Sequence, residues 1–130
     1  MELEFEETDS PVSAIIKGKV PSKSNCYQIV SNGKFSRLAK KKNLKEYEES
    51  FYIQLPPSLR SLNIDTWFEF HVDVFYPSNR SDIDNALKIL LDCLQKTKTI
   101  KNDNKCIKII ANKAVDKDNP RAEFRIVPIK

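Results

Sequence analysis

The chain has 130 residues, of which 40% are hydrophobic and 31% are charged, and this balance excludes an intrinsically disordered chain. No apolar run approaches the roughly 18–20 residues that a membrane-spanning helix requires, so a membrane partner is not expected. The net charge of +4 favours polyanionic partners, nucleic acid above all.

The N-terminal segment, residues 1–12, is acidic and could extend the first strand. It carries Glu2, Glu4 and further acids where a secretory signal would have basic residues and then an apolar run, so we expect a cytoplasmic protein. Residues 1–16 hold five acids and no base, which leaves 22 Lys and Arg against 13 Asp and Glu in the rest of the chain. The body of the protein is therefore more basic than the net charge alone indicates.

The first half of the chain predicts a strand, a hairpin and a helix. Residues 13–20 have the pattern of a strand, and residues 27–31 and 34–37 flank Asn32-Gly33, a dipeptide preferred in type I′ hairpin turns. Apolar residues then recur at helical spacing from about residue 40 to residue 55, where two prolines follow. The residues on the predicted apolar face of this helix are Leu44, Tyr47, Phe51 and Leu55.

The second half of the chain predicts a strand, a helix and two more strands. Residues 67–76 alternate with period two, and residues 82–96 place leucines along one face of a helix. Residues 105–115 and 122–129 have the pattern of two further strands. This order of elements predicts an α+β fold, with a single domain of 130 residues in which a small mixed β-sheet packs against two main helices.

The cysteines do not form a metal-binding pattern. Cys26, Cys93 and Cys106 are odd in number and widely spaced, and His71 is the single histidine of the chain. A tetrahedral zinc site needs four closely grouped nitrogen or sulfur ligands, so no zinc is expected. We expect three reduced thiols instead.

Two acidic residues mark the start of the predicted helix at 82–96. Ser81 could cap this helix with Asp84 as its capping-box partner, and the acids would then serve the helix dipole, at about 0.3–1 kcal/mol each. Alternatively, Asp82 and Asp84 flank the core-facing Ile83, so that both carboxylates lie at the exposed mouth of the helix. The second interpretation gives the acids a chemical role.

Further charged residues extend this acidic pair. Asp84, Lys88 and Asp92 recur at four-residue spacing and form one polar stripe, which could also be a salt-bridged face worth a few tenths of a kcal/mol per pair. Asp103 lies in a short polar loop directly before the next predicted strand. If the start of that strand lies beside the end of the preceding one, the same corner gathers Asp82, Asp84 and Asp103.

Such a cluster of carboxylates needs compensation. Two unit charges about 4 Å apart repel by roughly 4 kcal/mol at an effective dielectric of 20, so the carboxylates share a proton or hold a divalent cation. Oxygen ligands suit Mg²⁺, for which Mn²⁺ can substitute. A calcium-binding EF-hand loop from Asp82 is excluded, because its sixth residue is Leu87 instead of Gly and its twelfth is Cys93 instead of Glu. The sequence therefore predicts a cation that serves a phosphate.

The spacing of this motif is recognisable. Asp82-Ile83-Asp84-Asn85 is followed by Lys88 six residues after the first Asp and by Asp103 twenty-one residues after it. Together with Pro21-Ser22-Lys23-Ser24-Asn25-Cys26-Tyr27, the motif resembles the RusA family of Holliday junction resolvases, the crossover junction endodeoxyribonucleases. The resemblance covers residues 15–110.

This resemblance implies a Mg²⁺-dependent homodimeric endonuclease that cuts a four-way DNA junction on two opposing strands in recombination and repair. It assigns metal-binding catalytic roles to Asp82, Asp84 and Asp103, and makes Lys88 the active-site lysine. A lysine in that place could stabilise the developing negative charge or orient water. Two alternatives stay open: a non-catalytic binder of branched DNA that keeps the acids for folding, and a metal-dependent nuclease that acts on another nucleic acid.

Residues around the motif receive supporting roles. Asn85 is expected to brace Asp82 or the loop by hydrogen bonds, and Asp92 to support the site from the surface. Asn102 stands where many family members carry Asp, and Lys98 stands where a helix-ending Gly is common. The residues expected to bind DNA are Lys23, Asn25, Tyr27, Arg80 and Lys101.

Overall fold

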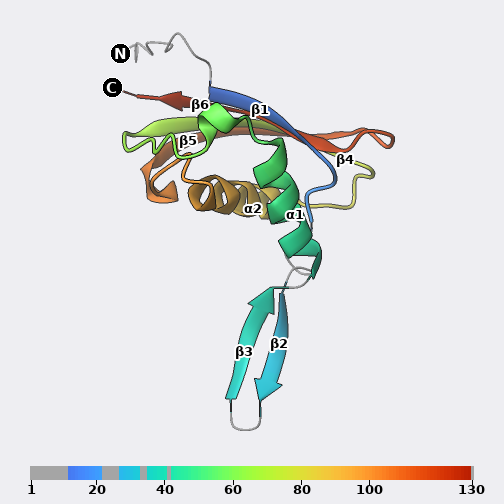
Figure 1. Ribbon diagram of the computed structural model, residues 1–130. Helices are drawn as coiled ribbons and strands as arrows, with labels where there is room; N and C mark the ends of the chain where they lie inside the picture. The colour runs from blue at the N-terminus through green and yellow to red at the C-terminus, as the bar shows by residue number, and fades with distance from the viewer. Residues whose placement is uncertain (1–11, 22–26, 33–34, 41, 130) are drawn as a thin grey trace.

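The computed structural model describes residues 12–21, 27–32, 35–40 and 42–129, the second and third of these ranges as backbone (Figure 1). The elements in chain order are β1 (Val12–Lys17), β2 (Tyr27–Asn32), β3 (Phe35–Lys40), α1 (Lys42–Gln54), the 3-10 turn η2 (Pro57–Leu59), β4 (Phe68–Tyr76), α2 (Ile83–Lys96), the 3-10 turn η3 (Asp103–Lys105), β5 (Cys106–Val115) and β6 (Arg121–Pro128). The predicted α+β order is confirmed. The centre of the predicted hairpin turn, residues 33–34, lies outside the described residues.

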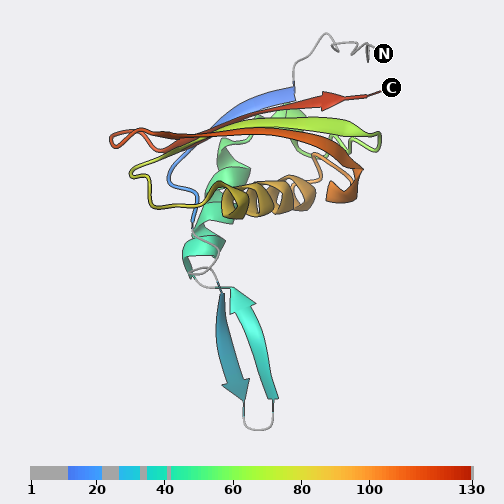
Figure 2. The same ribbon diagram turned by 180° about the vertical axis from the view of Figure 1, so that it is seen from behind.

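The main sheet is mixed, as predicted. Its strand order is β1-β6-β4-β5, with β4 and β5 parallel and the other neighbours antiparallel. Parallel neighbours need a crossover connection, and α2 supplies it by running back along the sheet between them. Strands β2 and β3 pair separately as an antiparallel hairpin that extends away from the sheet and the helices in both views (Figures 1 and 2).

Both helices lie on the same face of the sheet, and the core fills the space between (Figures 1 and 2). The predicted apolar face of α1 is buried throughout, and the ring of Phe51 stacks on that of Phe124 in β6, with 6.0 Å between their centroids. Phe70 of β4 meets Phe124 at the same distance. Aromatic pairs of this kind add about 0.5–1.5 kcal/mol each to the burial of their area.

The alternation of β4 divides its side chains between the core and the opposite face. The residues that face the core, all of them buried, are Phe68, Phe70, Val72, Val74 and Tyr76. Glu69 belongs to the other set yet is only 4% exposed, and its Oε1 lies 2.9 Å from Nε2 of His71. A buried carboxylate is costly without such a partner. The outer face of the sheet therefore carries a paired ionisable group that alternation alone predicts as exposed.

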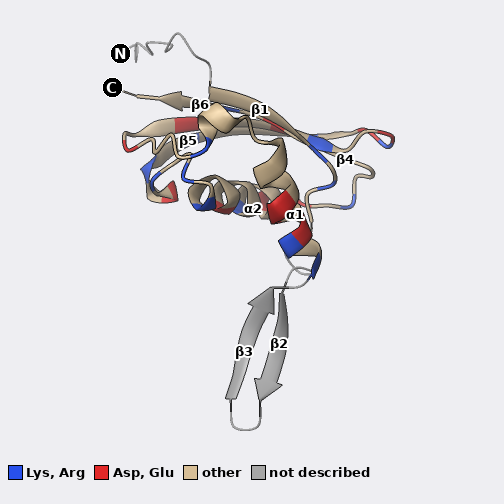
Figure 3. Ribbon diagram, viewed as in Figure 1, with Lys and Arg blue, Asp and Glu red and all other residues tan. Residues whose placement is uncertain are grey.

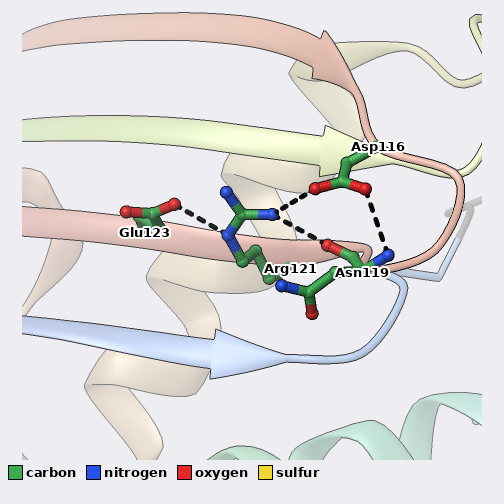
Figure 4. A network of polar contacts seen from close by, with 4 residues as sticks. All are labelled: Asp116, Asn119, Arg121 and Glu123. Carbon is green, nitrogen blue, oxygen red and sulfur yellow. Dashed lines mark hydrogen bonds and ion pairs between the residues drawn. The ribbon is translucent and has the colours of Figure 1, made fainter.

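The turn between β5 and β6 is held by Arg121 (Figure 4). Its Nη1 donates to Oδ2 of Asp116 at 2.8 Å and to the carbonyl of Asn119 at 2.9 Å, and its Nε donates to Glu123 at 2.8 Å. The hydrogen bond from Arg121 holds the pKa of Asp116 below its ordinary value. The guanidinium also lies 3.8 Å from the ring centroid of Phe75, so the turn is fixed from two sides.

Helix α2 ends in a reversal of the chain that leads to η3. Thr97 caps the helix, and Lys98 takes a left-handed conformation with φ of 59°. The amides of Thr99 and Ile100 then donate to the carbonyl of Leu94, which resembles the reversal that Gly commonly makes at helix ends. The sequence places Lys at this position, so the turn forms in spite of the steric cost of its Cβ. No helix in the described part of the chain is long and apolar enough to cross a bilayer.

Candidate active site

The first part of the site is the start of α2. Asp82 is the residue that precedes the first helical turn, with extended φ and ψ of −91° and 135°, and its side chain makes no capping hydrogen bond. The prediction that Ser81 caps the helix, with Asp84 as its capping-box partner, is therefore wrong. Asp82 and Asp84 are both exposed, two positions apart, at the N-terminal end of the helix. Their carboxylates remain available for chemistry.

Tyr76 connects this acidic pair to the sheet. It is the last residue of β4, and its phenol is buried and donates to the backbone carbonyl of Asp82 at 3.2 Å. Burial, together with the negative charges of Asp82 and Asp84, raises the pKa of Tyr76 to about 12. The negative charges of both carboxylates therefore disfavour ionisation of the Tyr76 hydroxyl. The sequence indicated Tyr76 only as an inward-facing strand residue, and no motif signals its contact with the site.

Lys113 supports the turn that carries Asp82. From β5, its Nζ donates to the carbonyl of Ser81 at 2.9 Å and to that of Asn79 at 3.1 Å. A lysine within a strand carries no sequence signal for this role. It became apparent only from the register in which Val74 of β4 pairs with Lys113.

The second part of the site is centred on Lys88. Its Nζ lies 3.6 Å from Oδ1 of Asp92 and 3.8 Å from Oδ2 of Asp103, so the ammonium sits between two carboxylates. The backbone amide of Asp103 also donates to Oε1 of Gln95 at 3.1 Å. Asn102 caps the η3 turn, and its side chain accepts from the amide of Asn104. The loop before β5 is thus attached to the flank of α2.

This geometry corrects the predicted position of Asp103. The prediction placed the start of β5 beside the end of β4. In the structure Phe68 pairs with Cys106, so the starts of the two parallel strands lie side by side. Burial raises the pKa of the Cys106 thiol, and the charges of Asp103 and Glu69 add to the effect, which places both carboxylates near this end. Asp82, at the opposite end of the crossover, does not share a corner with Asp103.

The carboxylates therefore form two groups along α2. Asp82 and Asp84 stand at its start, whereas Asp103 lies beside Lys88 and Asp92 on its flank. Over residues 12–21 and 42–129, where side chains are described, no three His, Cys, Asp or Glu side chains are grouped as a metal site. Mg²⁺ is commonly held by one or two carboxylates with water and substrate phosphates, so the oxygen pair of Asp82 and Asp84 fits this ion by itself.

The remaining predicted residues lie around these two groups. Arg80 is exposed in the turn before α2, and Asn85 is half-buried in the first turn of the helix. Lys101 is exposed, with its Nζ 3.4 Å from Oδ2 of Asp65. Helix α2 carries both basic and acidic residues, as Figure 3 shows, and these are all Lys and Asp. Lys23 and Asn25 fall outside the described residues, and Tyr27 is described as backbone within β2.

Comparison with known proteins adds evidence of a different kind. The family model described as "Endodeoxyribonuclease RusA" matches residues 18–127. Curated protein sequences gave no match. A solved structure of a GTPγS-form TubZ protofilament from Bacillus thuringiensis serovar israelensis is similar with 13% identity and a TM-score of 0.43.

The structural match to TubZ and the match to the RusA family model do not support conclusions equally well. The alignment with TubZ covers 89% of this chain but 24% of that chain, so this chain spans about a quarter of its length, and so weak a likeness carries no argument. The family match instead spans most of the chain and includes every residue of the acidic motif. The resemblance found in the sequence is confirmed, and the chain belongs to the RusA endodeoxyribonuclease family.

Proposed function

We propose that this protein is a Mg²⁺-dependent, structure-selective endonuclease that resolves four-way DNA junctions by paired symmetric nicks, with Mn²⁺ as a substitute ion. The observation that carries the proposal is the family match over residues 18–127, which contains the motif spacing from Asp82 to Asp103. Two exposed carboxylates at the start of α2 support it, and that of Asp82 makes no capping hydrogen bond.

Asp82 and Asp84 would hold the ion. When bound there, Mg²⁺ would polarise the scissile phosphate and lower the pKa of the attacking water. Lys88 would stabilise the negative charge that develops on the phosphate, as a compact cation one helical turn from Asp84. Asn85 and Arg80 lie next to the pair and would orient the carboxylates and bind a neighbouring phosphate, respectively.

Asp103 occupies the third carboxylate position of the family motif, and in the structure it contacts Lys88 at 3.8 Å. We propose that a DNA phosphate competes with Asp103 for the ammonium of Lys88. Such competition would release the Asp103 carboxylate from Lys88, and Asp92, at 3.6 Å from the same ammonium, would limit the electrostatic cost of the exchange.

Paired nicks require two sites, and we propose a homodimer. Strand β5 is a sheet edge that exposes apolar side chains, among them Ile109 and Ile110 near its centre. Exposed apolar edge strands favour pairing with another strand, and two β5 strands could pair antiparallel about a two-fold axis. Such pairing would bring the two central isoleucines of each copy together.

A cleavage assay tests the proposal. The protein is incubated with a labelled four-way junction, with the matching linear duplex and with a single-stranded RNA, each with Mg²⁺, with Mn²⁺ and with chelator. We expect symmetric nicks in the junction alone, and only when a divalent ion is present. Binding without nicks under every ion would show a non-catalytic binder of branched DNA, whereas equal cleavage of duplex or RNA would show a nuclease of different substrate class.

A further inference from the structure

Trp67 is an exposed aromatic residue directly before β4 that the proposed chemistry does not use. Its side chain is 52% exposed, although tryptophan usually contributes most of its area to a core or an interface. The backbone around it is fixed, because its carbonyl accepts the amide of Ile129 at 2.7 Å. The backbone that carries the ring is therefore hydrogen-bonded to the segment that follows β6.

Lysines and acids share the surroundings of Trp67, and one of the lysines contacts its ring. Nζ of Lys105 lies 4.8 Å from the centroid of the Trp67 ring, which is the distance of a cation–π contact. The neighbouring loop also carries Lys101, whose Nζ faces Asp65 across 3.4 Å. An aromatic face beside lysines is the combination by which proteins hold single-stranded or splayed nucleic acid, with bases on the ring and phosphates on the cations.

The ring also lies at the same end of the sheet as Asp103, the third acid of the motif. Lys105 is the last residue of η3, the turn that begins with Asp103, and Asp103 contacts Lys88. The pairing of Phe68 with Cys106 places the residues before them, Trp67 and Lys105, at the same end of the sheet. A strand of DNA held at Asp103 and Lys88 would therefore pass within reach of Trp67.

We propose that Trp67 is a stacking platform for a nucleobase whose stack is interrupted at the branch point of the DNA substrate. This inference rests on the proposed function and adds the residue that would distinguish branched DNA from plain duplex. In a continuous duplex each base is stacked and paired, whereas a branch point interrupts the stack and offers a base face to an aromatic ring. Lys105 holds the other side of the platform and neutralises the adjacent phosphate.

The chain has a single tryptophan, so intrinsic tryptophan fluorescence reports on this position alone. The full-length protein is titrated with a four-way junction in metal-free buffer, so that binding is observed without cleavage. We expect the emission to be quenched by the junction and to change far less with the matching linear duplex. Emission that depends on protein concentration in the absence of DNA would show that a second copy covers the ring, and would overturn the proposal.

Two substitutions of Trp67 and a matched control test how much the ring contributes to the affinity for the junction. Trp67→Ala should weaken junction binding by about 5- to 150-fold, the range measured when one stacked base loses its aromatic partner, whereas Trp67→Phe should keep most of the affinity. Tyr52→Ala is the control, because Tyr52 is 50% exposed and lies under the guanidinium of Arg60 at 4.2 Å, but belongs to α1. Junction binding by this control should equal that of wild type.

The outcomes separate the two proposals. Wild-type protein that binds and cuts junctions without a change in emission, and a Trp67→Ala variant of unchanged affinity, would overturn the stacking platform and leave the nuclease intact. Wild-type protein that neither binds nor cuts any junction would overturn both. If Trp67→Ala unfolds, as judged by circular dichroism, the emission change in wild type and the affinity of Trp67→Phe still decide the question.

Discussion

The side chain of Asp82 makes no hydrogen bond that caps α2. A substitution of Asp82 should therefore affect cleavage much more than the stability of the fold. Because the side chain makes no capping hydrogen bond, Asp82→Asn should lower the free energy of unfolding by no more than the helix-dipole contribution of about 0.3–1 kcal/mol. We expect this variant to lose detectable cleavage of a four-way junction in Mg²⁺, since a charged ligand is removed, and to bind the junction like wild type in metal-free buffer. Gel-based cleavage and binding assays measure the two effects.

Asp92→Asn is the matched control for Asp82→Asn. Asp92 lies on the same helix and contacts Lys88 at 3.6 Å, but Asp103 still faces that ammonium when Asp92 is neutral. We therefore expect substantial cleavage to remain. An inactive Asp92→Asn variant would mean that Asp92 is one of the residues required for cleavage. Loss of metal-free binding in Asp82→Asn would mean that Asp82 has a structural role after all.

Tyr76 makes the stability of the protein sensitive to alkaline pH. Its pKa is raised to about 12 in the folded protein and is 10.0 for an ordinary tyrosine, so the unfolded chain loses this proton first. The stabilisation is complete below pH 10 and is lost as the pH rises from 10 towards 12. Tyr76→Phe should make this decline shallower in urea titrations. Burial also raises the pKa of Tyr47, which therefore contributes to the decline in both proteins and cancels in the comparison. Equal slopes would contradict the assignment.

At the scale of the elements, the turn after α2 offers a simple test of backbone strain. Lys98 adopts φ of 59°, a conformation that costs a residue with a Cβ roughly 1 kcal/mol and costs Gly almost nothing. Lys98→Gly should therefore raise the free energy of unfolding by about 0.5–1 kcal/mol, although the unfolded chain becomes more flexible. Lys96→Gly is the opposite control, because Lys96 is the last residue of the helix and pairs with Glu48, and this substitution should lower the free energy of unfolding. Urea denaturation measures both.

Most elements could be predicted from the sequence because their signals are local. The alternation of β4 and the leucine face of α2 follow from which side chains must be buried, and the observed bounds differ from the predicted ones by a few residues. The buried Glu69 could not be predicted in this way, because the partner that stabilises it depends on the side-chain orientation of His71. The contact of Lys113 with the turn before α2 likewise depends on strand register.

The acidic pair at the start of α2 was predictable, whereas the position of Asp103 was predicted wrongly. The information needed was in the sequence, since a helix of 14 residues between two strands favours a parallel crossover. A parallel crossover brings the starts of β4 and β5 together and moves Asp103 away from the end of β4. The contact between Lys88 and Asp103 could not be predicted, because it depends on the path of the loop along α2.

At the scale of the whole molecule, the dimer proposal has its own test. Ile109→Asp would place a charge at the exposed centre of β5, where we expect the second copy to bind, and should convert the protein to a species of the 15.0 kDa chain mass. Ile53→Asp is the control, because Ile53 is 73% exposed on α1 and should leave the dimer intact. Sedimentation equilibrium measures the masses.

The same pair of variants should differ in their products. A monomeric Ile109→Asp variant is expected to leave junctions with single unpaired nicks, since each copy carries one site. Unchanged mass in Ile109→Asp would mean that β5 is not the dimer surface. A monomeric wild type that still makes paired nicks would mean that two sites are not needed in one assembly.

The strand order places the last strand of the chain in the interior of the sheet. β6 separates β1 from β4 and pairs with both, and it buries Ala122, Phe124 and Ile126 in the core. Until the ribosome has translated β6, β1 has no strand to pair with, and one edge of β4 lacks its hydrogen-bonding partner. Folding must therefore finish after β6 emerges from the exit tunnel, and a premature stop codon directly before Arg121 should yield a product that proteases remove.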